Sequence, residues 1–98
     1  MKPEDLGVTD THDLGDGSSW SWIADNDGNR IGIHVWHQCL RDYGPGTVIF
    51  DNEAANRMYK TVAKWTLVSA DPLTIAPSIH CLTCGHHGFI RDGVWIPA

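Results

Sequence analysis

The sequence predicts a mainly β fold, a small single domain of antiparallel hairpins with one short helix. Two observations predict it. Short runs of alternating apolar and polar residues flank clusters of Asn, Asp and Gly, a pattern that is typical of hairpins. The chain has 98 residues, which suits one core and one domain. A domain of this size buries a modest fraction of its surface, so an additional stabilising element such as a bound metal ion would contribute a useful share of its stability.

Residues 1–17 differ in composition from the rest of the chain. They carry five acidic side chains against one basic side chain, a net charge of −4 out of −5 for the whole sequence. Their main apolar anchors are Leu6, Val8 and Leu14. We therefore predict an acidic N-terminal arm at residues 1–17 and a β domain at residues 18–98. Either a partner or packing along its own domain would hold such an arm in place.

A hairpin is predicted between residues 18 and 37. Trp20 and Trp22 share one face of the first strand, and Ile31, Ile33 and Val35 share one face of the second. The cluster DNDGN between the two runs predicts a turn near Asp27-Gly28. One of these faces is expected to belong to the core.

The middle of the chain predicts a turn, a strand, a helix and a second strand. Arg41–Pro45 is polar and rich in turn residues, and residues 47–50 are all β-branched or aromatic. Residues 51–60 begin with an Asp/Asn cap and continue with helix formers. Residues 62–69 return to strand composition, and Asp71-Pro72 ends that strand.

The C-terminal part predicts one more hairpin. Leu73, Ile75 and Ile79 are expected to bring the chain into the core. Asp92-Gly93 separates two short apolar runs, and this dipeptide is a strong local signal for a two-residue hairpin turn.

The stretch HCLTCGHHG contains a pair of cysteines, Cys81 and Cys84, separated by two residues. Zinc favours four Cys and His ligands in a tetrahedron, and a pair with this spacing in a tight turn often supplies two of them. Gly85 allows the sharp turn. The sequence therefore predicts a zinc knuckle that staples the hairpins in a zinc-ribbon-like arrangement. The chain has three cysteines, an odd number that cannot complete a disulfide framework, and in a reducing cytoplasm clustered Cys and His favour metal binding.

Two further ligands must come from other positions. Cys39 lies at the end of a predicted strand, and His87 follows Cys84 by three residues and can fold back towards it. We predict a zinc site made of Cys39, Cys81, Cys84 and His87, with His37 as the alternative for the fourth place. The neighbouring residue His86 is expected to point away from the metal towards the surface.

The C-terminal third contains a pattern made of Pro77-Ser78-Ile79, Cys84, His87, Phe89-Ile90 and Asp92-Gly93. With this pattern the C-terminal third resembles DUF6527, a family of small uncharacterised proteins of bacteriophages and bacteria. His37-Gln38-Cys39 resembles a His/Cys cluster that the family often has upstream, whereas residues 1–17 lie outside the resemblance. The resemblance implies a small metal-binding protein of phage type and implies no particular activity.

The predicted ligand set favours a structural metal over a catalytic one. A catalytic zinc keeps a coordination position open for water, whereas four thiolate-rich protein ligands close the site. The chain contains neither an HExxH motif nor a GxSxG motif. We therefore expect a protein that is not an enzyme.

Charge and hydropathy narrow the class of partner to proteins. The acidic balance and the lack of a basic run disfavour nucleic acid. No apolar run approaches the ~20 residues of a membrane span, and the acidic start lacks the order of a signal peptide. The expected function is a phage-type, zinc-stabilised protein-interaction module that modulates a host factor in the host cytoplasm. The alternative is a virion structural protein, either decorating or tail-associated, and a nucleic-acid-binding zinc module ranks third.

Overall fold

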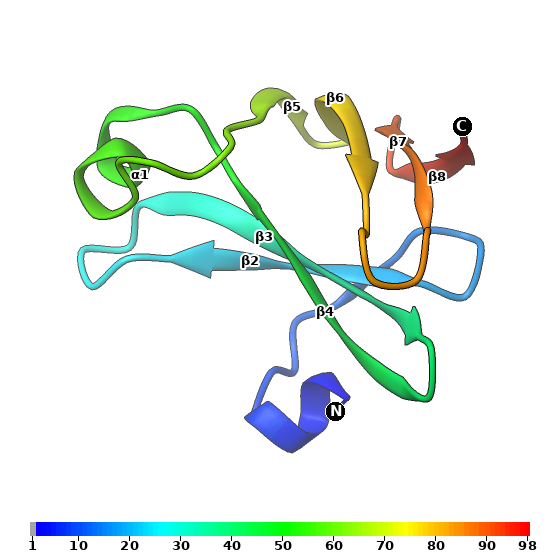
Figure 1. Cartoon of the computed structure of the whole chain (residues 1–98). Coiled ribbons are helices and arrows are strands. Elements are labelled where there is room, and N and C mark those ends of the chain that lie inside the picture. Colours follow the sequence, from blue (N-terminus) through cyan, green and yellow to red (C-terminus); the bar gives the residue numbers. More distant parts are fainter. Residues whose placement is uncertain (1) are drawn as a thin grey trace.

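The computed structural model describes residues 2–98 and confirms the mainly β fold of antiparallel hairpins. Two four-stranded sheets pack against each other (Figure 1). The first has the order β1-β2-β3-β4 and the second has the order β5-β6-β7-β8. In chain order the elements are the 3-10 helix Pro3–Leu6, β1 His12–Asp13, β2 Ser19–Ala24, β3 Arg30–Cys39, β4 Asp42–Ile49, α1 Glu53–Met58, β5 Thr66–Ala70, β6 Leu73–His80, β7 His87–Arg91 and β8 Val94–Pro97.

The predicted hairpin between residues 18 and 37 is confirmed as β2 and β3. Trp20 pairs with Val35 across the two strands, and Trp22 pairs with Ile33. Asp25 organises the turn, because its carboxylate accepts hydrogen bonds from the backbone N–H groups at positions 27 and 29. These four paired side chains belong to, or pack against, the main core.

The prediction of a polar turn at Arg41–Pro45 is wrong, because β4 already begins at Asp42. The long β3 provides the reason: its pairing with β4 continues as far as Cys39 opposite Asp42, and only Leu40 and Arg41 form the turn. Pro45 fits in β4 because this strand lies at the edge of its sheet, where a missing N–H costs little.

The connection between the sheets contains the predicted helix. Asn52 caps α1, since its side-chain oxygen accepts a hydrogen bond from the N–H of Ala55 at 2.8 Å. The strand predicted from residue 62 begins only at Thr66, after a single parallel bridge between Phe50 and Trp65. Lys64 donates a hydrogen bond to the carbonyl oxygen of Tyr59, which holds the preceding residues in a loop.

The C-terminal hairpin is also confirmed. Arg91 pairs with Val94 across a two-residue turn, in which Asp92 has φ +52° and Gly93 has φ +78°. Two positive φ values in succession define the turn type that matches the twist of a hairpin. Pro77 lies inside β6 where the pairing with β7 is irregular, so its missing N–H leaves no regular ladder position empty.

The main core lies between the two sheets and draws on both. Alternation places every second residue of a strand on this inner face. The opposite face of the first sheet buries Trp36, whose indole N–H donates to Ser21 at 2.9 Å. Members of the core are Leu14, Trp20, Ile33, Val35, Val48, Phe50, Leu73, Ile75, Ile90 and Trp95, with Ile79 packed against them.

The N-terminal arm has two parts with different surroundings. The 3-10 helix lies on the side of the first sheet that faces away from the second sheet (Figure 1). Further along the arm, β1 pairs with β2, and Leu14 is only 1% exposed within the main core. The N–H of Trp95 donates to the carbonyl oxygen of Leu14 at 2.9 Å, which joins the arm to β8. Within residues 2–98, no helix has the length and apolar character needed to cross a bilayer.

Replacing Leu14 with alanine is expected to lower the free energy of unfolding by about 2–5 kcal/mol, because it leaves a cavity between the sheets. Leu6→Ala serves as the matched control, since Leu6 is 53% exposed in the same arm and its truncation should change stability by less than about 0.5 kcal/mol. Urea denaturation followed by circular dichroism measures both. Equal effects of the two variants would contradict the packing of Leu14.

Candidate metal centre

Four donor side chains meet at one end of the molecule. The ligand atoms of His37, Cys39, Cys81 and Cys84 all lie within 4.8 Å of one another, the one such group found in residues 2–98. The sulfurs of Cys39 and Cys81 are 3.8 Å apart. In a tetrahedral site with metal–sulfur bonds of about 2.3 Å, two sulfurs lie about 3.8 Å from each other. The four residues therefore form a group that could bind a metal ion.

The strand β3 supplies two of the four donors. Ile33 and Val35 point into the core, and the same face of the strand continues through His37 to Cys39. Of these, His37 is 5% exposed and Cys39 is partly buried. His37 and Cys39 thus lie on the same face of β3 as the apolar residues that pack against the second sheet.

The loop between β6 and β7 supplies the other two. The N–H of Cys81 donates to the carbonyl oxygen of His86, and the N–H of Gly85 donates to the carbonyl oxygen of Cys81, both at 2.8 Å. These bonds close the loop so that Cys81 and Cys84 face the same point. Gly85 has φ +81°, a conformation that glycine adopts without steric cost. The predicted knuckle turn is present.

His37 is oriented by the backbone. Its Nδ1 lies 3.1 Å from the carbonyl oxygen of Val35, so this nitrogen carries the proton that is donated. Its Nε2 is buried and has no hydrogen-bond partner among residues 2–98. A buried nitrogen with a free lone pair costs free energy unless something satisfies it. Coordination of a metal ion by Nε2 would satisfy it, with the backbone carbonyl fixing the tautomer.

The electrostatics of the three thiols also fit a cation. A hydrogen bond from the backbone N–H of Cys84, with smaller contributions from its neighbours, lowers the pKa of Cys81 to about 6 against the opposing effect of burial. Burial and, to a lesser degree, the neighbouring thiols of Cys81 and Cys84 raise the pKa of Cys39 to about 11. Negative charge therefore concentrates on the sulfur of Cys81, whereas Cys39 resists ionisation. A bound cation removes that resistance, because it stabilises every coordinating thiolate.

The structure brings together four of the five predicted donors. Cys39, Cys81, Cys84 and the alternative ligand His37 form the group, whereas His87 lies outside it. His87 begins β7 opposite His80, and its exposed ring stacks on the ring of His80 at 4.5 Å between centroids. Its Nε2 lies 3.1 Å from the hydroxyl oxygen of Ser78. Pairing in the sheet thus directs His87 away from the sulfurs.

His86, which was expected at the surface, is turned inwards. Its ring lies 4.2 Å from that of Trp95 and 4.9 Å from that of His37, measured between centroids. Its Nε2 is 3.8 Å from a carboxylate oxygen of Asp16, on the loop between β1 and β2. Burial lowers the pKa of His86, the nearby His37 lowers it further, and Asp16 opposes both. No motif in the sequence distinguishes His86 from His87, because strand pairing decides which of the two faces inwards.

A pair of histidine variants tests the ligand set. His37→Ala is expected to weaken metal binding by about 100-fold or more, since loss even of groups that only orient a ligand costs 10- to 100-fold. His87→Ala is the matched control and should leave metal affinity unchanged, because its ring contacts His80 and Ser78 instead. Competition with a chromogenic chelator measures both affinities. If His87→Ala weakened metal binding more than His37→Ala, the fourth ligand would be His87 and the assignment of His37 would be wrong.

Comparisons of the chain with family models, curated proteins and solved structures found no match. The resemblance of the C-terminal third to DUF6527 therefore stays a prediction.

Proposed function

We propose that this protein is a protein-interaction module without enzymatic activity, whose two sheets are held together by structural zinc. The observation that carries the proposal is the set of four donors that joins the two sheets. His37 and Cys39 come from β3 of the first sheet, and Cys81 and Cys84 come from the β6–β7 loop of the second. A metal ion bound there would fasten the sheets at a further point, in addition to the bridge between Phe50 and Trp65 and the backbone hydrogen bond from Trp95 to Leu14.

The donor chemistry supports zinc. Three thiolates and one imidazole are soft or borderline ligands, whereas magnesium and calcium take oxygen ligands. Zinc has no redox chemistry of its own and accepts the tetrahedral arrangement of a Cys₃His set. Such a set is also a usual composition for structural zinc sites.

The same set argues against catalysis at the metal. Four protein ligands fill a tetrahedron and leave no position for an activated water or a substrate. The three thiolates also donate charge to the ion, which makes it a weaker Lewis acid. We therefore propose that the protein acts by binding another protein through its surface.

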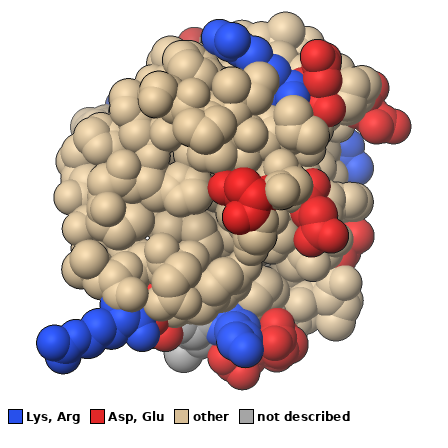
Figure 2. Space-filling view, turned by 90° about the vertical axis from the view of Figure 1, so that its right-hand side faces the viewer, with Lys and Arg blue, Asp and Glu red and all other residues tan. Residues whose placement is uncertain are grey.

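The surface beside the metal centre supports binding to a protein. Leu40 and Leu82 each follow a metal-ligating cysteine directly in sequence, and they are 67% and 89% exposed. Figure 2 shows the face of the molecule that lies on the right in Figure 1, and most of this face carries no Lys, Arg, Asp or Glu side chain. Uncharged surface with exposed apolar side chains is typical of the central part of protein interfaces.

The proposed partner is a host factor, with a phage structural protein as the alternative. The resemblance to DUF6527 supports a phage context, and with it the host cytoplasm or the virion as the location. The net charge of −5 and the uncharged face weigh against direct binding to nucleic acid.

Removal of the metal at neutral pH is expected to unfold the protein. Structural zinc binds with about 10–16 kcal/mol in small zinc domains, which matches or exceeds the whole stability of about 5–15 kcal/mol of a typical domain. Native mass spectrometry should find one zinc ion per chain, and a chelator should abolish the near-ultraviolet circular dichroism. The control is the same chelator saturated with zinc. A metal-free chain with an unchanged melting temperature would contradict a structural role.

Photo-crosslinking tests the interaction surface. A photoreactive phenylalanine analogue in place of Leu82 is expected to form one discrete adduct in cells of the natural host, because this position projects from the loop beside the metal. The matched control carries the analogue at Val68, an apolar residue of β5 that is 61% exposed, and should form no such adduct. Mass spectrometry of the adduct identifies a host or a phage protein. Equal labelling at both positions, or none at Leu82, would contradict the proposed surface.

A further inference from the structure

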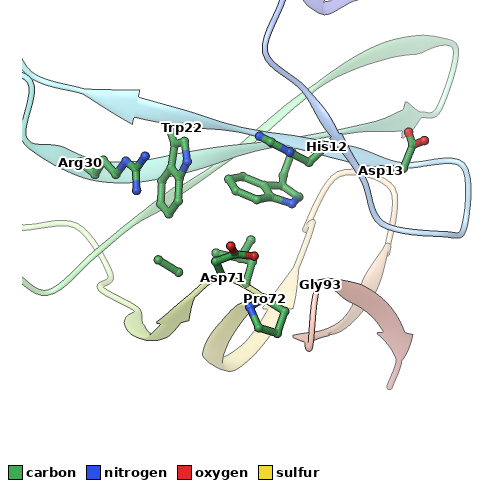
Figure 3. A pocket seen from close by; sticks show the side chains of 10 residues that line it. His12, Asp13, Trp22, Arg30, Asp71, Pro72 and Gly93 are labelled. Carbon is green, nitrogen blue, oxygen red and sulfur yellow. The ribbon is translucent and has the colours of Figure 1, made fainter.

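A second site lies at the end of the molecule away from the metal loop. A cavity of about 430 Å³ opens between the sheets (Figure 3). Trp20 and Trp22 of β2 line it on the first sheet, and residues 70–73, the turn between β5 and β6, line it on the second. Cys81 follows the other end of β6. The volume falls in the range of about 300–1,000 Å³ that is usual for small-molecule sites.

Aromatic rings form one wall of the cavity. The rings of Trp20 and Trp22 lie 4.9 Å apart between centroids and meet at 87°. The ring of His12 stacks on Trp20 at 4.5 Å, and the guanidinium group of Arg30 lies 4.1 Å from the centroid of the Trp22 ring. These contacts hold both tryptophans in fixed orientations. The wall is therefore rigid, apolar across its centre and polar at its margins.

Polar groups from both sheets at this cavity have hydrogen-bonding capacity that none of the described residues uses. Within residues 2–98, neither the carboxylate of Asp71 nor the guanidinium of Arg30 makes a hydrogen bond or an ion pair, and the indole N–H groups of Trp20 and Trp22 make none either. In Figure 3 the carboxylate of Asp71 points from the turn towards the aromatic side chains, and Arg30 lies beside Trp22. The cavity thus offers acceptors from one sheet and donors from the other.

The charges exclude two classes of ligand. Two acidic residues, Asp13 and Asp71, line the cavity against the single guanidinium of Arg30, so a phosphate-bearing ligand would meet no excess of positive charge. A quaternary ammonium ion would need the aromatic faces, but Arg30 already lies over Trp22 and would repel it. A neutral ligand that both donates and accepts hydrogen bonds remains.

We propose that this cavity binds a neutral sugar ring, as a monosaccharide or the end of a short oligosaccharide. Hydroxyl groups both donate and accept, so they match Asp71 opposite Arg30 and the indole N–H groups. The C–H groups of a sugar ring pack against an aromatic face. A flat nucleobase stacks on one ring only, whereas a puckered sugar ring is thick enough to contact two rings that meet at 87°. This proposal does not depend on the metal centre or on the proposed protein partner.

The test is a titration of the full chain, purified with its metal, against neutral sugars. The panel consists of glucose, galactose, mannose, N-acetylglucosamine and their common disaccharides, with choline and adenosine monophosphate as competitors of the excluded classes. Tryptophan fluorescence and ¹H–¹⁵N spectra report binding. At least one sugar should give saturable shifts that include the indole N–H signals of Trp20 and Trp22. No saturable shift with any sugar, or tighter binding of either competitor, would overturn the proposal.

Two variants locate the binding. Asp71→Asn keeps the volume of the side chain and should weaken sugar binding by about tenfold, because one carboxylate acceptor is lost and the other becomes a weaker, neutral acceptor. Asp27→Asn is the matched control in the β2–β3 turn outside this cavity and should have no effect. Trp22→Phe, checked for folding by its melting temperature, should also weaken binding. Equal affinities for Asp71→Asn and the unchanged protein would overturn the assignment.

Discussion

The alternation of side chains along β3 is the constraint on which both the core and the metal centre depend. Ile33 and Val35 face the second sheet, and the same face carries His37 and Cys39 beyond the edge of the core. A slip of one residue in the pairing would turn all four side chains to the opposite face. Burial of the apolar pair therefore fixes the direction of the two donors. Trp36, which is fully buried on the other face, resists the same slip.

The two sheets meet at this face with little help from the backbone. Apart from the bridge between Phe50 and Trp65 and the hydrogen bond from Trp95 to Leu14, strand pairing lies within each sheet. Contact between the sheets therefore depends mainly on apolar packing, on the chain that connects them and on the side chains at their ends. Leu14 closes the core from the arm and accepts a hydrogen bond from Trp95. The donor group lies at another edge of the core, where Val35 and Trp95 are next to polar side chains. The apolar core and the four-residue donor group thus both lie between the same two sheets.

Much of the fold follows from local patterns in the sequence. The hairpin turns at Asp27-Gly28 and Asp92-Gly93, the Asn52 cap and the Cys81–Cys84 knuckle all depend on residues that are neighbours in the chain. The start of β4 was missed because pairing with the long β3 overrides the turn preference of residues 41–45. The choice among His37, His86 and His87 depends on strand register and on packing against Trp95. Such contacts have no local signature.

The four donor residues come from two distant parts of the chain, so the two pairs leave the ribosome at different times during synthesis. Cys39 precedes Cys81 by 42 residues, and the first sheet is complete at Ile49. When that sheet emerges from the ribosome, His37 and Cys39 offer only two ligands, and the ion has nothing to close its tetrahedron. A metal ion at this group would be held only after Cys84 has emerged and the second sheet has docked. Metal occupancy would therefore distinguish chains that have been translated past Cys84 and folded from chains that have stopped short.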